Sequence, residues 1–279
     1  MVDLSKEATE KCFEEYIDKI FSLSEIMSAK VRDINITRDN KKDTLGQAFE
    51  AGYHDCLSDI DFSVKVSIPK NGAISPEDYI KRIDRFGVDE NTALGFCLVP
   101  ENRMYRIIFK NGMRYDFGFD FEYSEDSNQK LEEKSFFEEK TGLKENNENW
   151  PRENINRFWF VQIQALGKLY RKDYLIGSHL ANMNCNETLV MQMVLRDIKY
   201  GTNHHRYGYS EELEYIKDLG KSPFKCEDQT FNRISNHLYA AAVVYDRMAK
   251  SFYLEYNNRS EVFFDIWRSY HESIRGTVL

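Results

Sequence analysis

Several features are scarce in this chain of 279 residues, and each scarcity excludes a class of protein. The five cysteines, Cys12, Cys56, Cys97, Cys185 and Cys226, are odd in number and form no CxxC pair. Scattered cysteines of this kind are typical of reduced proteins, so we expect a cytoplasmic protein and no disulfide scaffold. No apolar run approaches the roughly 18 residues that a membrane span needs, and the amino terminus lacks the basic and apolar regions of a secretion signal.

Positive charge is scarce as well. The 46 acidic residues outnumber the 38 basic ones, which gives a formal net charge of −8. Surfaces that bind nucleic acid are normally basic, so we expect no nucleic-acid partner. The pair His204-His205 has no cysteine or carboxylate at zinc-site spacing beside it, which favours a solvated loop. Hydrophobic residues make up 42% of the chain, with 17 Tyr and 19 Phe, and this is enough for a folded core.

The first half alternates between helix and strand signals. Apolar residues at helical spacing predict a helix over residues 5–30, and a strand is expected within 31–45. A strand is predicted over 57–68 and another over 93–99. Between them, Ser75 as N-cap, Pro76 at the first position and Gly87 as terminator predict a helix of about three turns. Asn111-Gly112, between two β-rich runs, predicts a hairpin over 104–123.

The second half is helical in its pattern. Residues 124–149 are polar and predict a connector that carries some helix. Helices are then expected over 154–182, unbroken or broken, and over 186–201, 209–220, 229–251 and 259–274. The fold class we predict is α+β, with a mixed β-sheet and flanking helices in residues 1–150 and a helical-bundle domain in residues 151–279.

The stretch "LSDIDFSV", residues 57–64, carries the main chemical signal. Side chains alternate along a strand, so Asp59, Asp61 and Ser63 point to one side while the apolar residues between them point to the other. Two adjacent carboxylates repel each other unless a cation lies between them. Asp116, on the second arm of the predicted hairpin, can add a third carboxylate if that arm joins the same sheet.

Three carboxylates on one sheet face indicate a hard divalent cation. Mg²⁺ prefers oxygen ligands, and proteins usually share it between a few carboxylates and the phosphates of a substrate. Two such ions can hold the attacking and leaving oxygens of a phosphoryl-type transfer. The alternative for a D-x-D strand is an exposed edge strand with solvated aspartates. Gly46, 13 residues before Asp59, supports the first interpretation, because a glycine at a strand end lets the backbone approach a phosphate.

This pattern resembles the nucleotidyltransferase superfamily that includes DNA polymerase β, whose members combine a glycine-serine turn, a D-x-D strand and a third carboxylate on a later strand. Further motifs are similar to the streptomycin (aminoglycoside 6-) adenylyltransferase family. They are "RFG", "VPEN", "IIFKNGMRYDF" and "NRFWFVQIQALGKLYRKDYLIGSHLAN". The resemblance extends from about Gly46 to about Gly201.

The resemblance implies roles for individual residues. Asp59 and Asp61 would bind Mg²⁺, and Asp116 would be a third metal ligand or the base that takes the proton of the acceptor hydroxyl. Asp120, on the same side of that arm as Asp116, would be the base or an acceptor contact. The residues implied for nucleotide binding are Gly46, Gln47, Ser58, Lys168 and Arg171. Gln47 stands where the family has serine.

The implied reaction transfers AMP from ATP to a hydroxyl of a small cationic acceptor, such as an aminoglycoside antibiotic, and releases pyrophosphate. The helical domain would complete the cleft for nucleotide and acceptor in a monomer or a homodimer. Two alternatives remain open at this point. One is a nucleotidyltransferase fold that binds nucleotide with little or no turnover. The other is a D-x-D glycosyltransferase that uses Mn²⁺ and a nucleotide sugar, although no Rossmann-like start precedes Asp59.

Overall fold

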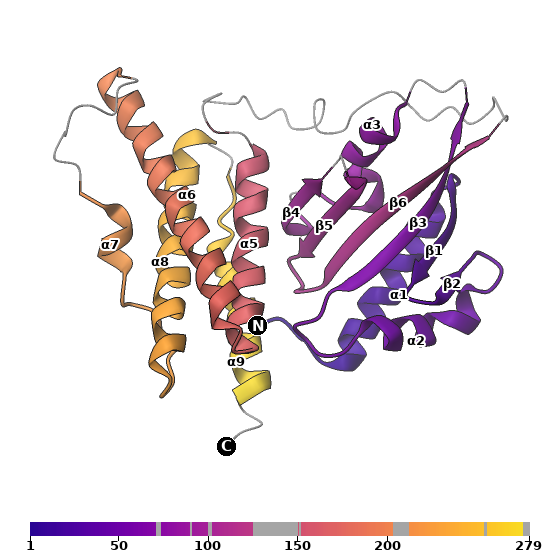
Figure 1. The fold of residues 1–279 in the computed structure, drawn as a ribbon, viewed down its shortest axis with the longest axis horizontal. Helices are drawn as coiled ribbons and strands as arrows, with labels where there is room; N and C mark the ends of the chain where they lie inside the picture. Colours follow the sequence, from indigo (N-terminus) through magenta and orange to yellow (C-terminus); the bar gives the residue numbers. More distant parts are fainter. Residues whose placement is uncertain are drawn as a thin grey trace. The chain divides into compact units, whose positions relative to one another are not determined.

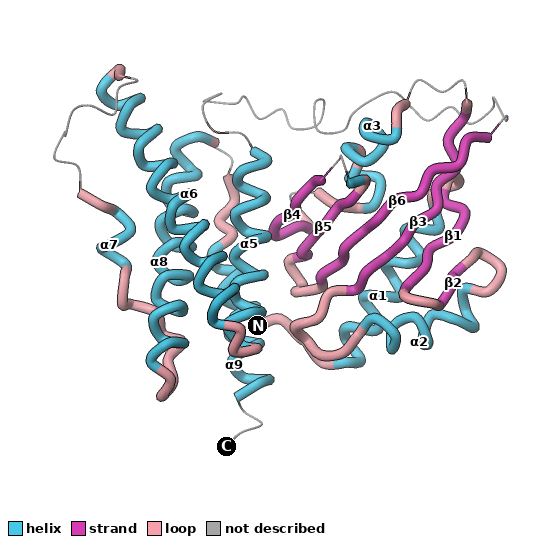
Figure 2. Tube along the Cα trace, in the orientation of Figure 1, coloured by secondary structure: helices cyan, strands magenta, loops and turns pink. Residues whose placement is uncertain are grey.

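A computed structural model describes residues 1–70, 74–89, 91–99, 102–124, 150, 152–202, 212–253 and 256–275. The described residues form an α+β protein with one six-stranded mixed sheet and eight α-helices. The chain divides into a first unit, Val2–Gly142, and a second unit, Leu143–Leu279 with Met1. Figure 2 shows the strands of the first unit and the helices and loops of the second. The predicted connector, apart from Ser124, and the His204-His205 pair lie outside the described residues.

The sheet of the first unit has the order β2-β1-β3-β6-β5-β4 (Figure 1). Only the central pair, β3 and β6, is parallel, and the other neighbours are antiparallel. The strands are β1 (Ile26–Val31), β2 (Ile34–Ile36), β3 (Ile60–Pro69), β4 (Ala93–Val99), β5 (Met104–Phe109) and β6 (Arg114–Ser124). The predicted hairpin is confirmed as β5 and β6, with Gly112 at a φ of +86° in its turn.

Strand alternation gives the sheet one apolar face and one polar face. On β6, Tyr115, Phe117, Phe119 and Phe121 are buried, and their rings stack along the strand and against neighbouring elements. Helix α1 (Lys6–Ser22) covers this apolar face, and its Tyr16 ring stacks on that of Tyr115 at a centroid distance of 4.7 Å. The alternate residues of β3 and β6 therefore project from the opposite, polar face.

The amino-terminal elements differ from the prediction. Helix α1 ends at Ser22, and residues 26–31 form β1 where the periodicity predicted more helix. The pairing of β1 with β3 supplies backbone hydrogen bonds that outweigh the helical propensity of this short stretch. The predicted strand within 31–45 is reduced to three residues. Helix α2 (Lys41–Gly52), which was not predicted, follows it.

The helix predicted after Ser75 is present but divided. Helix α3 (Pro76–Lys81) begins as expected, with Ser75 Oγ accepting from the Asp78 amide over 3.1 Å. It ends after six residues and is followed by a 3₁₀ helix over Ile83–Phe86. Gly87, at a φ of +72°, stops the segment as the sequence predicted.

The second unit is helical in its described part. Its elements are α5 (Arg152–Tyr170), α6 (Tyr174–Tyr200), α7 (Glu214–Asp218), α8 (Gln229–Phe252) and α9 (Ser260–Arg275). The predicted helix over 154–182 breaks at Lys172, which has a φ of +58°, and Asp173 caps α6. The helix predicted over 186–201 is the second half of α6. Among the helices so described, none combines the length and the apolar character that a membrane crossing requires.

A buried aromatic cluster holds α5 and α8 together. The rings of Phe158 and Tyr245 stack at a centroid distance of 3.6 Å, and the fully buried Trp159 packs edge-on against Tyr245.

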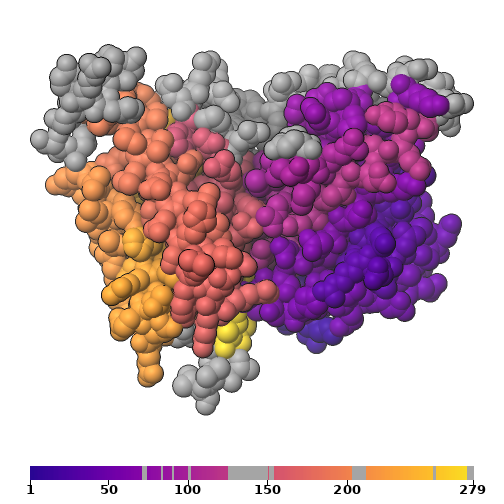
Figure 3. All heavy atoms as spheres, in the orientation of Figure 1, coloured from indigo at the N-terminus to yellow at the C-terminus, as the bar shows by residue number. Residues whose placement is uncertain are grey.

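In the spheres of Figure 3 the first unit runs from indigo to magenta and the second from red to yellow. On the surface of α6, Ile176, Met183 and Val190 are exposed at intervals of seven residues.

Candidate functional site

The parallel pair β3 and β6 brings the aspartates of two distant segments together. Asp61 and Asp116 are direct partners in the register of the two strands. Paired residues of adjacent parallel strands project from the same face, and their strands lie about 4.8 Å apart. Asp59 immediately precedes β3, two positions before Asp61. The polar face of the sheet thus carries all three aspartates.

Two arginines neutralise part of this negative charge. Arg106, the β5 partner of Asp116, donates from Nε and from Nη2 to Asp116 Oδ2, each over 2.6 Å. Its Nη2 also lies 3.7 Å from Asp59 Oδ2. Arg114 donates from Nη2 to Asp59 Oδ2 over 3.3 Å and from Nη1 to the Leu57 carbonyl over 2.8 Å, which anchors the loop that carries Asp59.

Asp61 is the one of the three aspartates that has no ion-pair partner in the described part of the chain. It is exposed, and it forms no ion pair or hydrogen bond with the described residues. Partial desolvation by the surrounding sheet nevertheless raises the pKa of the Asp61 carboxyl, and the charge of Asp59 raises it further. Burial raises the pKa of the Asp116 carboxyl to about 6 against the opposing effect of Arg106. Asp116 is ionised at neutral pH, and a carboxylate whose pKa is raised sits in an environment that would favour an added cation.

The sheet face beside the aspartates is open. The next pair in register is Ser63 and Gly118, two residues with little or no side chain. A Cβ on Gly118 would meet only the Phe62 carbonyl oxygen, at 3.8 Å. A ligand can therefore approach the backbone of β6 next to Asp116 without displacing a side chain of the described residues.

The chemistry of this donor set fits a hard divalent cation, since carboxylate oxygens are the ligands that Mg²⁺ prefers. The geometry is not that of a finished metal centre. Within the described ranges, no three His, Cys, Asp or Glu side chains converge so that they could hold a metal ion as they stand. Arg106 takes up the space between Asp116 and Asp59, so binding through these two carboxylates would require a local rearrangement.

The structure corrects the expectation for Gly46 and Gln47. Both lie inside α2, as its sixth and seventh residues, and not in a turn at a strand end. Only the first four amides of a helix are free to bind an anion, so the amides of Gly46 and Gln47 are used within the helix. Phe49 of α2 packs against Phe13 of α1, which places this helix on the apolar side of the sheet, away from the aspartates. The predicted phosphate turn at Gly46 is wrong.

The other residues predicted for nucleotide binding have local partners. Ser58, directly before Asp59, donates from Oγ to Asp55 Oδ1 over 3.0 Å and so helps to close the turn that leads into β3. Lys168, in the last turn of α5, pairs with Asp173 at 3.4 Å. Arg171 follows α5 directly, and its amide is bonded to the Gly167 carbonyl. Lys168 and Arg171 belong to the second unit, and their predicted phosphate contacts stay predictions.

Asp120 lies apart from the three aspartates. It is four residues beyond Asp116 on β6, about 13 Å along the strand, and it is exposed opposite Lys65. A base must lie within hydrogen-bond reach of the proton that it removes. Of the two residues predicted for this role, the geometry favours Asp116.

This difference predicts unequal effects of two matched substitutions on β6. Asp120→Asn should leave turnover within about twofold of the unmodified protein, whereas Asp116→Asn should lower it at least about a hundredfold, the range typical of general-base help. Pyrophosphate release measured on both variants compares the same chemical change at two positions of one strand face. A tenfold loss of turnover in Asp120→Asn would show that Asp120 takes part in the reaction.

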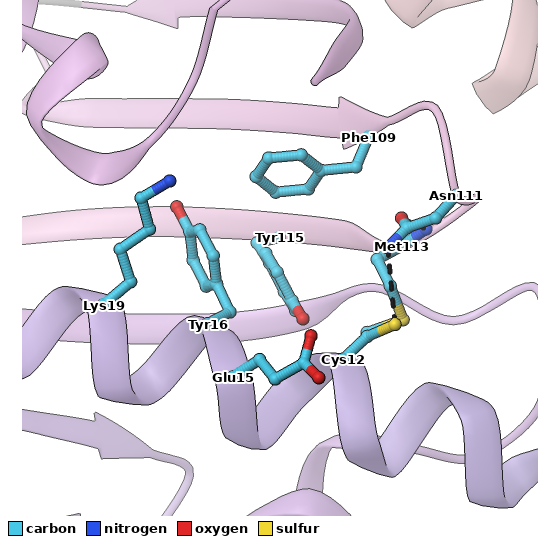
Figure 4. Close-up of a pocket in the computed structure, with 8 residues that line it drawn as sticks. All are labelled: Cys12, Glu15, Tyr16, Lys19, Phe109, Asn111, Met113 and Tyr115. Atoms are coloured by element: carbon cyan, nitrogen blue, oxygen red, sulfur yellow. Dashed lines mark hydrogen bonds between the residues drawn. The ribbon is translucent and has the colours of Figure 1, made fainter. Parts of the chain in front are cut away.

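A separate cavity lies on the apolar side of the sheet, between α1 and the β5–β6 hairpin (Figure 4). It measures about 190 Å³ and contains the buried hydroxyls of Tyr16 and Tyr115, which have no hydrogen-bond partner among the described residues. At its rim, Asn111 Nδ2 lies 3.4 Å from Cys12 Sγ. A polar cavity of this size can hold water, which would satisfy the two hydroxyls. It lies across the sheet from the aspartates.

The sequence prediction missed the arginines of the site. The signal was present, because Arg106 alternates with the apolar residues of "YRIIF" and Arg114 stands two positions before Asp116. Both therefore had to project from the face that carries the aspartates. Arg32, which follows β1 and whose charge offsets a small part of the rise in the pKa of Asp61, could be found only from the β1–β3 pairing.

Comparison with known proteins adds no family assignment. No protein-family model matches the sequence, and no curated protein matches it.

Proposed function

We propose that this protein is a magnesium-dependent nucleotidyltransferase that moves AMP from ATP to a hydroxyl of a small cationic acceptor. One observation carries the proposal: Asp61 and Asp116 are register partners on the two central parallel strands, with Asp59 two positions away on the same polar face. This is the arrangement that the D-x-D strand and the third carboxylate of the superfamily lead one to expect.

Each residue of the face has a part in the proposed reaction. Asp61 and Asp59 would hold Mg²⁺, which when bound would neutralise the charge of the triphosphate. Asp116 would complete the metal site or accept the proton of the acceptor hydroxyl, since its pKa of about 6 keeps it ionised at neutral pH and still basic. The acceptor oxygen would form a bond to the α-phosphorus while the bond to the bridging oxygen breaks and pyrophosphate leaves.

An aminoglycoside is the acceptor that the motif resemblance suggests. The net charge of −8 and the exposed Asp120 and Glu122 beyond the site are compatible with a polycationic molecule. A helical second unit that completes the cleft for the acceptor is part of the proposal, as are the nucleotide contacts of Lys168 and Arg171.

One observation favours a second candidate, nucleotide binding without turnover. The residues that align with the phosphate turn of the family, Gly46 and Gln47, lie within a helix. A protein with the three carboxylates and no phosphate turn could bind Mg²⁺–ATP and transfer nothing.

Pyrophosphate release separates these two candidates. The protein is incubated with ATP, Mg²⁺ and a panel of aminoglycosides, and each reaction is repeated with excess chelator. The proposed function predicts release that needs both Mg²⁺ and one class of acceptor. If calorimetry shows ATP binding but no acceptor gives pyrophosphate release, the second candidate is favoured. If the protein neither binds ATP nor releases pyrophosphate, both candidate functions are contradicted.

A further inference from the structure

Arg106 occupies the position between two of the three carboxylates. Its Nη2 lies 2.6 Å from Asp116 Oδ2 and 3.7 Å from Asp59 Oδ2. Its Nε donates to the same Asp116 oxygen over 2.6 Å, so two carboxylates share the charge of one guanidinium. A cation that bridges Asp59 and Asp116 would have to occupy the space where this guanidinium lies.

The three carboxylates differ in how they are compensated. Arg114 is buried and tied to the Leu57 carbonyl, so its contact with Asp59 belongs to the framework of the loop. The Arg106 side chain is 28% exposed, and β5 places it on the open face. Asp61 has no ion pair in the described part of the chain. Of the two arginines, Arg106 is therefore the one that lies between two carboxylates on the more exposed side of the site.

We infer that Arg106 is an internal counter-cation that competes with a divalent cation for Asp116 and Asp59. The inference rests on the proposed function, because it concerns the same carboxylates. In the metal-free protein the guanidinium holds the two buried or half-buried carboxylates in place, where uncompensated charges would be costly. An arriving cation binds first at the unpartnered Asp61 and then exchanges with Arg106 at Asp116.

Competition has a thermodynamic consequence that a purely structural ion pair lacks. If the guanidinium and the metal ion exclude each other, removing the guanidinium must tighten metal binding, because metal binding no longer breaks an ion pair. If Arg106 only supports the fold, removing it would loosen the site and weaken metal binding. The two roles thus predict changes in metal affinity of opposite direction when the guanidinium is removed.

The test is the affinity of the full-length protein for Mn²⁺, measured by calorimetry at neutral pH without nucleotide. Arg106→Gln should bind Mn²⁺ at least about tenfold more tightly than the unmodified protein. Lys65→Gln is the matched control, since it removes one positive charge from the same face of β3, where Lys65 pairs with Glu122 about 13 Å along the strand from Asp61, and it should change the affinity by no more than about twofold. Thermal melting gives a second readout, in which Mn²⁺ should raise the melting temperature of Arg106→Gln more than that of the unmodified protein.

The outcomes separate this inference from the proposed function. Unmodified protein that binds Mn²⁺, with equal or weaker binding by Arg106→Gln, overturns the inference and leaves the proposed function standing. Absence of Mn²⁺ binding by both proteins overturns both. Should Arg106→Gln fail to fold, Arg106→Lys replaces it. A lysine ammonium keeps the charge but cannot place two nitrogens on Asp116 as the guanidinium does, so affinity should still rise severalfold, and an unchanged affinity overturns the inference.

Discussion

Replacing Asp61 with asparagine should lower adenylyl transfer by about 10²–10³-fold, the cost typical of removing one preorganised electrostatic group from an active site. Asp61 is exposed and forms no ion pair in the described part of the chain, so the fold does not depend on its charge. An amide is a weaker and neutral ligand for a hard cation. The loss should therefore appear in pyrophosphate release and in metal affinity, with little change in the melting temperature.

Ser63→Ala is the control for this substitution. Ser63 is the next residue on the same face of β3, and it is exposed as Asp61 is. Its replacement should leave turnover within about twofold of the unmodified protein, because a serine hydroxyl there is a weak ligand compared with a carboxylate. Equal activity of the Asp61→Asn and Ser63→Ala variants would show that Asp61 has no role in the reaction.

Affinity for Mn²⁺ should fall about tenfold between pH 7 and pH 5. Burial raises the pKa of the Asp116 carboxyl to about 6, so this group is ionised at pH 7 and mostly protonated at pH 5. A protonated carboxyl is not a metal ligand, and one pH unit below a pKa leaves about a tenth of the group ionised. Lowering the pH through about 6 therefore removes the ligand, and raising it restores the ligand.

The variant Asp116→Asn isolates the source of this dependence. It should bind Mn²⁺ weakly at every pH and should show a much smaller change between pH 7 and pH 5. Calorimetric titrations at both pH values, in buffers of matched ionic strength, provide the comparison. Unmodified protein whose affinity is constant down to pH 5 would show that Asp116 does not bind the metal.

The parts of the fold that were predictable are those with strong local signals. The Asn111-Gly112 hairpin, the Ser75 cap and strand β4 follow from turn chemistry, capping and β-rich composition within a few residues. The alternation along β6 correctly placed its aromatic residues in the core and Asp116 on the other face.

The remainder depends on contacts between distant segments. Residues 26–30 fall in the stretch whose periodicity predicts a helix, and the pairing of β1 with β3 and β2 makes them part of a strand. The register that sets Asp61 opposite Asp116 joins residues 55 positions apart, and no local pattern fixes it. No local pattern fixes the position of Arg106 between Asp59 and Asp116 either. Gly46 was misplaced because a glycine at a family-like spacing was interpreted as a turn, while the surrounding residues form a helix.

The central claim is that the face of β3 and β6 binds a divalent cation and a nucleotide together. A crystal structure of the protein with Mn²⁺ and an ATP analogue that cannot be cleaved between the α- and β-phosphates tests it most directly, because anomalous scattering locates manganese without ambiguity. We expect manganese bonded to the carboxylates of Asp61 and Asp116, with phosphate oxygens completing its coordination. Nucleotide bound elsewhere, with no manganese at these two aspartates, would contradict the claim.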